Sequence, residues 1–389
     1  MLSITRLLCG SPTPGDDLRY GEPRNGPRRT SGIHHRPVVV WNVTRRCNLH
    51  CAHCYSASHD KHYPGELTSA EGLDLIDEMA RFGVPVVLFS GGEPMMRADL
   101  PVLIDHARTV GVQPVVSTNG TLLNGAMTRR LYEAGLRRVG ISLDGLEATN
   151  DKFRGAKGAF RDALAGIRNA TEIGMSVSVR FTMTGRNVAD LKGIFELAQE
   201  ESVPRLCVYH LAYAGRGAKL LPFDLSAQSR RDALVELFEL TVEANSGGRR
   251  FEVLTVDNHS DGPFLVLWSK QHAPHRTAEI EALLRRNGGN STGTGIACVD
   301  NTGNVHPDQF SWSRSVGNVR QKQFGDIWSS SDDVHLANLR NRKPLLDARC
   351  RGCKWLDMCN GNLRVRGESA TGDPWGFDPA CYLTVEERT

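Results

Sequence analysis

Short apolar runs alternate with amphipathic stretches over the first half of the chain, beginning at Val38. The apolar runs predict strands at 38–43, 84–90, 113–117, 138–143, 176–182 and 206–211. The stretches between them repeat apolar residues at helical spacing and predict helices at 69–82, 99–110, 126–134, 160–173 and 187–200. Strands that alternate with helices form a parallel sheet, so the pattern predicts an α/β fold.

The pattern changes in the second half of the chain. Residues 227–244 and 279–286 predict two amphipathic helices, and a polar, turn-rich segment lies between them at 255–262. A glycine-rich stretch at 287–295 precedes a predicted hairpin at 296–306. We therefore divide the chain into a flexible N-terminal arm (1–36), an α/β domain (37–215), a helical connecting segment (216–290) and a small α+β domain (291–389).

Length, composition and charge exclude several classes of protein. The 389 residues suit two or three domains, and 40% hydrophobic and 23% charged residues are normal for a globular protein. A net charge of +3 argues against nucleic acid as the main partner. No apolar run is long enough to span a membrane, and the N-terminal residues lack the apolar core of a secretion signal. We expect a cytoplasmic monomer.

Three cysteines lie close together after the first predicted strand. Cys47, Cys51 and Cys54 have the spacing C-x3-C-x2-C. Three thiolates can converge on one soft metal centre, and on a cluster of four irons they leave one iron open for a small chelating ligand. Zinc is the alternative, with His50 or His53 as a further ligand.

A second group of cysteines lies near the C-terminal end. Cys350, Cys353 and Cys359 have the spacing C-x2-C-x5-C, and Cys381 follows. Four thiolates can close the shell of a [4Fe-4S] cluster or of a zinc ion, and the spacing alone favours zinc. Two tight groups of cysteines without a secretion signal indicate metal binding rather than disulfides.

The sequence Gly-Gly-Glu-Pro follows the second predicted strand at 91–94. Glycines let backbone come close to a ligand, and a glutamate can hold an ammonium group. Placed one strand after the cysteine loop, this motif makes residues 38–213 resemble the radical SAM superfamily. The resemblance implies a partial (β/α)6 barrel, a [4Fe-4S] cluster on the first three cysteines, and S-adenosylmethionine contacted by Gly91, Gly92 and Glu93.

The same resemblance implies roles for the loops that follow the third and fourth predicted strands. The loops at 117–120 and 142–145 resemble those that face the ribose and carboxylate of S-adenosylmethionine, which implies contacts from Ser117, Asn119 and Ser142. The alternative role for such residues is helix capping.

Two arginines compete for one implied role. Arg180 resembles the basic residue that pairs with the methionine carboxylate, and Arg154 is the competing candidate. A surface ion pair is the alternative for either. His53 precedes the last cysteine of the loop, where the superfamily often has an aromatic residue, so His53 or Tyr55 is expected to pack against adenine.

The C-terminal cysteines resemble those of SPASM and twitch domains, which carry auxiliary clusters on the pattern C-x2-C-x5-C-x3-C. Leu363 stands where the last cysteine of that pattern belongs, and Cys298 resembles an upstream ligand without its partners. The resemblance reverses the preference for zinc. It implies a single auxiliary [4Fe-4S] cluster in a small α+β domain, held by Cys350, Cys353, Cys359 and Cys381.

Three blocks resemble more narrowly the radical SAM proteins of haem d1 biosynthesis, the NirJ family. They are Trp-Asn-Val-Thr-Arg-Arg-Cys at 41–47, Thr-Val-Asp-Asn-His-Ser-Asp-Gly at 255–262 and Gly-Asp-Pro-Trp-Gly-Phe-Asp at 372–378. The resemblance implies an enzyme that cleaves S-adenosylmethionine reductively. Its 5′-deoxyadenosyl radical would remove or remodel two propionates of 12,18-didecarboxysirohaem. The alternatives are the deacetylase of the alternative haem pathway, which acts on acetates of the same substrate, and a SPASM-type peptide maturase.

The implied partners are an iron tetrapyrrole and a reducing donor such as flavodoxin or ferredoxin. Arginine suits carboxylates and imidazole suits iron, so the candidate substrate contacts are His259, His306, Arg364 and Arg366. Each could instead be a solvated or locally hydrogen-bonded side chain. A non-catalytic iron–sulfur protein is a further alternative, against which the motif for S-adenosylmethionine argues.

Overall fold

An eleven-stranded sheet organises the structure, a computed structural model that describes residues 1–21, 36–248 and 250–389. Its strands are β1 (Leu2–Ser3), β2 (Val38–Thr44), β3 (Val86–Gly91), β4 (Gln113–Thr118), β5 (Arg138–Ser142), β6 (Ser176–Met183), β7 (Arg205–His210), β8 (Glu252–Val256), β9 (Ile296–Val299), β10 (Asn304–His306) and β11 (Gly317–Asn318). Their order is β1-β8-β7-β6-β5-β4-β3-β2-β9-β10-β11. The pairs from β8 to β9 are parallel, and β1, β10 and β11 pair antiparallel at the two edges.

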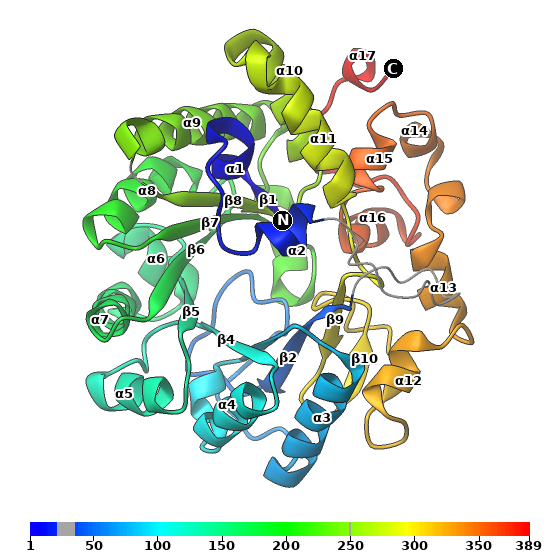
Figure 1. Ribbon diagram of the computed structural model, residues 1–389. Coiled ribbons are helices and arrows are strands. Elements are labelled where there is room, and N and C mark those ends of the chain that lie inside the picture. Colours follow the sequence, from blue (N-terminus) through cyan, green and yellow to red (C-terminus); the bar gives the residue numbers. More distant parts are fainter. Residues whose placement is uncertain (22–35, 249) are drawn as a thin grey trace.

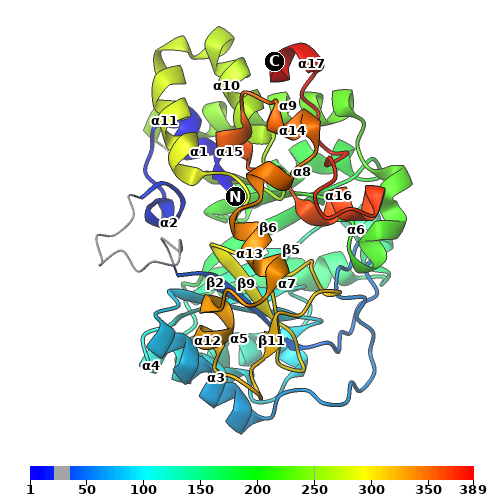
Figure 2. The ribbon, with the colours of Figure 1, turned by 90° about the vertical axis from the view of Figure 1, so that its right-hand side faces the viewer.

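Helices cover the outside of this sheet (Figure 1). Those of the barrel are α3 (Ser69–Phe82), α4 (Leu100–Thr109), α5 (Gly125–Glu133), α6 (Glu147–Arg154), α7 (Ala159–Glu172), α8 (Leu191–Glu200) and α9 (Ala227–Asn245). Those that follow are α10 (Asp261–His272), α11 (Thr277–Asn287), α12 (Phe324–Ser329), α13 (Val334–Arg340), α14 (Ala348–Arg351), α15 (Leu356–Cys359), α16 (Arg364–Thr371) and α17 (Val385–Arg388). The strands curve into a partial barrel, and the C-terminal helices lie along its open side (Figures 1 and 2).

Local sequence explains why these helices form where they do. In α3, the Thr68 side chain accepts a hydrogen bond from the backbone N–H of Glu71, and the Glu71 carboxylate accepts one from the backbone N–H of Thr68. Leu75 and Met79 point into the core one turn apart, and Gly83 ends the helix in a left-handed conformation. The predicted strands and helices of the barrel are confirmed within a few residues, whereas α6 was not predicted.

The N-terminal residues correct one prediction. The flexible arm predicted for 1–36 is wrong for residues 1–21, because β1 pairs with β8 and is followed by α1 (Ile4–Cys9) and α2 (Asp16–Tyr20). Ile4 and Leu7 are fully buried, and the Thr5 hydroxyl donates to the carbonyl of Phe251 at 2.9 Å. The helical spacing of these few apolar residues was hidden by the Pro, Gly and Arg content that follows. Residues 22–35 of the predicted arm lie outside the described residues.

The second half of the chain also joins the barrel sheet. The predicted helical connection at 216–290 contains β8, which extends the sheet in parallel beside β7. The predicted hairpin is confirmed as β9 and β10, and β9 pairs in parallel with β2. The C-terminal part therefore continues the barrel sheet as well as carrying its own helices. Within the described part of the chain, no helix combines the length and apolar character needed to cross a bilayer.

Candidate active site

The first cysteine loop leaves the sheet at the end of β2 and folds back on itself. The Cys47 backbone N–H donates to the carbonyl of His59 at 3.1 Å, so the two ends of the loop meet. The Arg216 guanidinium donates to the carbonyls of Cys51 and Ser58, each at 2.8 Å. Within this fold the three predicted ligands, Cys47, Cys51 and Cys54, pack into one small cluster.

Gly91 and Gly92 make room for this loop. A Cβ at Gly91 would lie 2.2 Å from the carbonyl oxygen of Thr44, and one at Gly92 would lie 2.2 Å from that of Arg46. Gly91 also has a φ of +132°, which L side chains rarely adopt. We predicted that these glycines approach a ligand. In the structure they approach the backbone that leads into Cys47.

Glu93 is fully buried between the ends of β3 and β4. One carboxylate oxygen accepts from the Thr118 hydroxyl at 2.8 Å and from the Met95 backbone at 3.2 Å, and the other accepts from the Asn119 backbone at 2.9 Å. Burial raises the pKa of Glu93 to about 7 despite these bonds. Its carboxylate thus joins two strand ends, and an ammonium contact stays a prediction.

Polar groups flank two of the three loop cysteines. The Asn119 side-chain nitrogen lies 4.0 Å from Sγ of Cys47, and the Arg154 guanidinium lies 3.5 Å from Sγ of Cys51. Arg154 also forms a buried ion pair with Asp144. Burial raises the pKa of the Cys47 thiol to about 12, so metal binding must displace its proton. Arg154 favours the thiolate form of Cys51 that a metal requires.

The other predicted S-adenosylmethionine contacts gather on neighbouring strands. Arg180 hydrogen-bonds the Ser117 hydroxyl and lies opposite Ser142 in the β5–β6 register. Arg154, by contrast, contacts Cys51 from the end of α6, so the two arginines occupy different places. Ser117 and Ser142 lie at the carboxyl ends of β4 and β5, where ligands of parallel sheets bind, and Arg180 lies beside them in β6.

His53 and Tyr55 differ in their surroundings. The His53 ring packs 4.8 Å from the ring of Phe153, and its Nε2 lies 3.5 Å from Asp144. Desolvation lowers the pKa of His53 to about 4, so the ring is neutral at pH 7. The Tyr55 hydroxyl instead donates to Asn42 at 2.9 Å. The structure thus keeps His53 next to the polar groups around the cysteines and ties Tyr55 to β2.

The second cysteine group surrounds one pocket. All four predicted ligands line it, and so do the largely apolar side chains of Trp355, Leu356, Phe377 and Leu383. The four ligands are Cys350, Cys353, Cys359 and Cys381. Burial raises the pKa of the Cys359 thiol well above its usual value, and the three neighbouring cysteines add to the shift. Four thiols around one pocket suit a group that needs no further ligand.

The described ranges contain no three Cys, His, Asp or Glu side chains that converge closely enough to share a single metal ion. A tetrahedral zinc holds its sulfurs about 2.3 Å from one centre, whereas each cysteine on a cubane binds a different iron. The assignment of a [4Fe-4S] cluster to each group of cysteines stays a prediction.

Cys298 does not belong to either group. It lies on β9 opposite Val40, fully buried, and the Asn42 side-chain amide contacts its Sγ at 3.3 Å. It does not line the pocket of the C-terminal cysteines. Its resemblance to an upstream cluster ligand has no support in this arrangement.

Three predicted substrate contacts have protein partners instead. Arg366 is fully buried and binds both carboxylate oxygens of Asp378, each at 2.9 Å. Arg364 donates to backbone carbonyls, including that of Gly376 at 2.9 Å. The His306 ring bonds to Asp300 at 3.2 Å and, through its other nitrogen, to backbone carbonyls. A substrate role does not fit these three residues, because their polar atoms already hold the C-terminal loops.

His259 is different from those three. It is buried, its backbone N–H donates to Asn362 at 2.7 Å, and no described residue hydrogen-bonds its ring. Burial lowers the pKa of His259 well below its usual value, so the ring is neutral and has a nitrogen free to bind a metal or accept a hydrogen bond. The predicted substrate contact at His259 stays open.

Sequence reasoning missed Arg216, which fastens the cysteine loop. A signal was present in its glycine neighbours: a Cβ at Gly215 would lie 2.3 Å from the carbonyl oxygen of Tyr55, and one at Gly217 would lie 2.6 Å from that of Ala212. An arginine between two glycines indicates close backbone contact on both sides. Asp144, the partner of Arg154, was noticed only as part of a loop.

Comparisons with known proteins agree with this geometry. The profile of the radical SAM superfamily matches residues 41–198, and that of SPASM, an iron-sulfur cluster-binding domain, matches residues 290–354. The chain is 51% identical to the Fe-coproporphyrin III synthase of Methanosarcina barkeri, over 100% of this chain and 98% of that protein. It is 42% identical to the pre-heme d1 synthase of Dinoroseobacter shibae, over 90% of this chain and 87% of that protein.

The solved structure of anSMEcpe with bound AdoMet shares the fold. It superposes with a TM-score of 0.69 at 18% identity, over 89% of this chain and 94% of that one. The SPASM match ends before Cys359 and Cys381, so the last two predicted ligands of the second group rest on the pocket geometry.

Proposed function

The chain belongs to the radical SAM superfamily, and on that premise we propose that it removes acetate side chains from the iron tetrapyrrole 12,18-didecarboxysirohaem to give Fe-coproporphyrin III. The observation that carries this proposal is the 51% identity to an Fe-coproporphyrin III synthase over 100% of the chain. That match includes β1, α1 and α2, which pack on the edge of the barrel. We therefore rank deacetylation, the alternative from the sequence, ahead of propionate removal.

Propionate removal or remodelling on the way to haem d1 is the second candidate. The 42% identity to a pre-heme d1 synthase over 90% of the chain and the block at 372–378 support it. Both reactions start from the same tetrapyrrole and differ only in the side chain that is attacked. A peptide maturase has weaker support: the PqqA peptide cyclase of Gluconobacter oxydans is 28% identical over 89% of this chain and 90% of that protein.

We infer that the first cysteine loop holds a [4Fe-4S] cluster and S-adenosylmethionine, which together supply a 5′-deoxyadenosyl radical for hydrogen abstraction. The protein's own part is to hold and orient. Arg154 and Asn119 fix the surroundings of Cys51 and Cys47, and Glu93 fixes the strand end beside them. Gly91, Gly92, Ser117, Ser142, Arg180 and His53 remain the proposed contacts of the cofactor. Their place at one edge of the sheet supports this.

We infer a second [4Fe-4S] cluster on Cys350, Cys353, Cys359 and Cys381, which would accept an electron released as product forms. Apolar side chains such as Trp355 and Phe377 line that pocket together with charged ones such as Arg349 and Arg388. Arg366 and Asp378 keep the Cys381 loop in place, because Asp378 also accepts hydrogen bonds from the backbones of Leu363 and Ala380. His259 is the remaining proposed contact for the tetrapyrrole iron or a carboxylate.

The test is an anaerobic assay of the reconstituted protein with dithionite, S-adenosylmethionine and 12,18-didecarboxysirohaem, followed by mass spectrometry. Loss of two acetates with formation of 5′-deoxyadenosine is the expected result. A change at the propionates would favour the second candidate. Formation of 5′-deoxyadenosine with an unchanged tetrapyrrole would rule out this substrate.

A further inference from the structure

The outer surface of the first cysteine loop is basic. Arg46, His50, His59, Lys61 and His62 are all exposed. The sole acidic residue among residues 45–62 is Asp60, whose carboxylate is paired with Arg46 at 2.7 Å. The net charge of +3 counts histidines as neutral, so the fixed positive charges among these five residues are Arg46 and Lys61.

Two lysines extend this surface: Lys152 lies in α6, and Lys157 lies in the turn between α6 and α7. The end of α6 packs against the loop, because the Ala52 N–H donates to the carbonyl of Phe153 at 2.9 Å. Lys152 and Lys157 are exposed on either side of that contact. Together with the loop residues they form what we call the basic surface: Arg46, His50, His59, Lys61, His62, Lys152 and Lys157.

The lysines of the basic surface have no acidic partners of their own. Among the ion pairs of the described residues, none involves Lys61, Lys152 or Lys157. Nearby Asp151 uses its carboxylate to accept from the backbones of Gly158 and Phe160, at 2.5 and 2.8 Å. These three lysines therefore carry positive charge without an ion-pair partner among the described residues.

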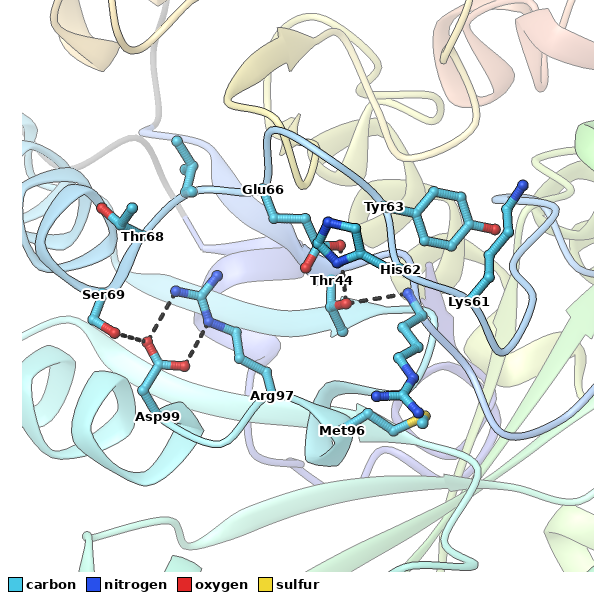
Figure 3. Close-up of a pocket in the computed structure, with 12 residues that line it drawn as sticks. Thr44, Lys61, His62, Tyr63, Glu66, Thr68, Ser69, Met96, Arg97 and Asp99 are labelled. Atoms are coloured by element: carbon cyan, nitrogen blue, oxygen red, sulfur yellow. Dashed lines mark hydrogen bonds and ion pairs between the residues drawn. The ribbon is translucent and has the colours of Figure 1, made fainter.

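A polar recess deepens the basic surface beside the ends of β2 and β3. Lys61, His62 and Tyr63 line it together with Glu66 and Arg97, and Figure 3 draws these side chains. The Asp99 carboxylate there is already bound by Arg97, at 2.7 and 2.9 Å. An acidic side chain of a docked protein would meet Lys61 and His62 at the rim.

The basic surface lies next to the first predicted cluster ligand. Arg46 precedes Cys47, about 3.8 Å away between Cα atoms, and the His59 carbonyl accepts from the Cys47 N–H at 3.1 Å. Arg216 holds both sides of the loop through the carbonyls of Cys51 and Ser58. A protein docked here would lie beside the loop that carries Cys47, Cys51 and Cys54.

We propose that the basic surface is the docking site of an acidic one-electron donor protein of the flavodoxin or ferredoxin class. The proposal rests on the proposed function only in that the centre at Cys47, Cys51 and Cys54 must be reduced from outside. In this step the donor loses one electron and that centre gains one, and no bond forms or breaks. Opposite charges speed the encounter and set its orientation.

The test compares two sources of electrons in the reconstituted enzyme. The variant Lys61→Glu/Lys157→Glu reverses two charges of the basic surface, and Lys192→Glu is the matched control on the exposed face of α8. The rate of 5′-deoxyadenosine formation is measured with reduced flavodoxin, with reduced ferredoxin and with dithionite. The quantity compared is the ratio of each protein-driven rate to the dithionite-driven rate.

We expect this ratio to fall about tenfold or more in the double variant at low salt and subsaturating donor, and to stay unchanged in Lys192→Glu. The wild-type ratio should also decrease as ionic strength rises. A ratio that stays at the wild-type value for both donors, or that falls equally in the control, would overturn the proposal. Because the assay follows 5′-deoxyadenosine, its result does not depend on which tetrapyrrole side chain the enzyme removes.

Discussion

The two cysteine sites are built in opposite ways. The first draws its three cysteines from one short loop at residues 47–54, at the end of a central strand of the sheet. Polar groups surround it, including Asn119 and Arg154. The second collects four cysteines over residues 350–381 from short helices and a turn, around a pocket that both apolar side chains, such as Trp355 and Phe377, and charged side chains, such as Arg349 and Arg388, line.

This difference matches two kinds of chemistry. A site with three ligands and polar neighbours can admit a small charged cofactor. A site with four ligands can hold a closed group that exchanges only electrons. The contrast also predicts how substitutions affect each site. The position of the first site depends on the sheet, whereas that of the second depends on a few buried side-chain contacts.

The largest effect is expected from losing the first site. In Cys47→Ala/Cys51→Ala/Cys54→Ala, formation of 5′-deoxyadenosine should fall to background, because S-adenosylmethionine loses the iron that binds it. Iron per chain should fall by about half, since one of two four-iron clusters is lost. Anaerobic iron analysis and product assays check this. Retained cleavage would mean that the other cysteines hold the reactive cluster.

Loss of the second site should abolish conversion of the tetrapyrrole without abolishing cleavage of S-adenosylmethionine. In Cys381→Ser, iron should again fall by about half, while cleavage of S-adenosylmethionine continues and the tetrapyrrole is no longer converted. Cys298→Ser is the matched control, because Cys298 is buried outside the pocket, and its iron content should stay at the wild-type value. The prediction fails if Cys298→Ser loses as much iron as Cys381→Ser.

A smaller effect should follow when the support of the second site is removed. Arg366→Met leaves the Asp378 carboxylate buried without its ion-pair partner, which costs about 3–5 kcal/mol of stability. Urea unfolding measures the loss. Since the damage is near Cys381, the auxiliary iron should become labile to chelators while cleavage of S-adenosylmethionine survives. Equal chelator sensitivity in wild type and variant would contradict this.

The smallest effect is expected at the first site. Arg154→Lys keeps the positive charge but loses the fork that reaches both Cys51 and Asp144. We expect a loss of about 1–2 kcal/mol in stability and a several-fold slower cleavage of S-adenosylmethionine. Arg180→Lys serves for comparison, because Arg180 contacts Ser117 and not a cysteine. A change in the cluster's electronic spectrum should appear only in Arg154→Lys.

The barrel was predictable from sequence, and the long-range contacts were not. Apolar runs and helical spacing locate β2 to β7, and cysteine spacing locates both predicted cluster sites, because these signals are local. That Arg366 pairs with Asp378, or that Arg154 faces Cys51, depends on residues brought together by the fold. The N-terminal segment was misjudged because its buried residues, such as Ile4 and Leu7, are too few to stand out.

The most direct single measurement is electron paramagnetic resonance of the reduced Cys381→Ser variant, titrated with S-adenosylmethionine. If the first loop holds the cofactor-binding cluster, the remaining signal should shift on addition of S-adenosylmethionine as it does in the wild-type protein. A signal that does not respond, with the response present in the wild type, would contradict the assignment of the two sites.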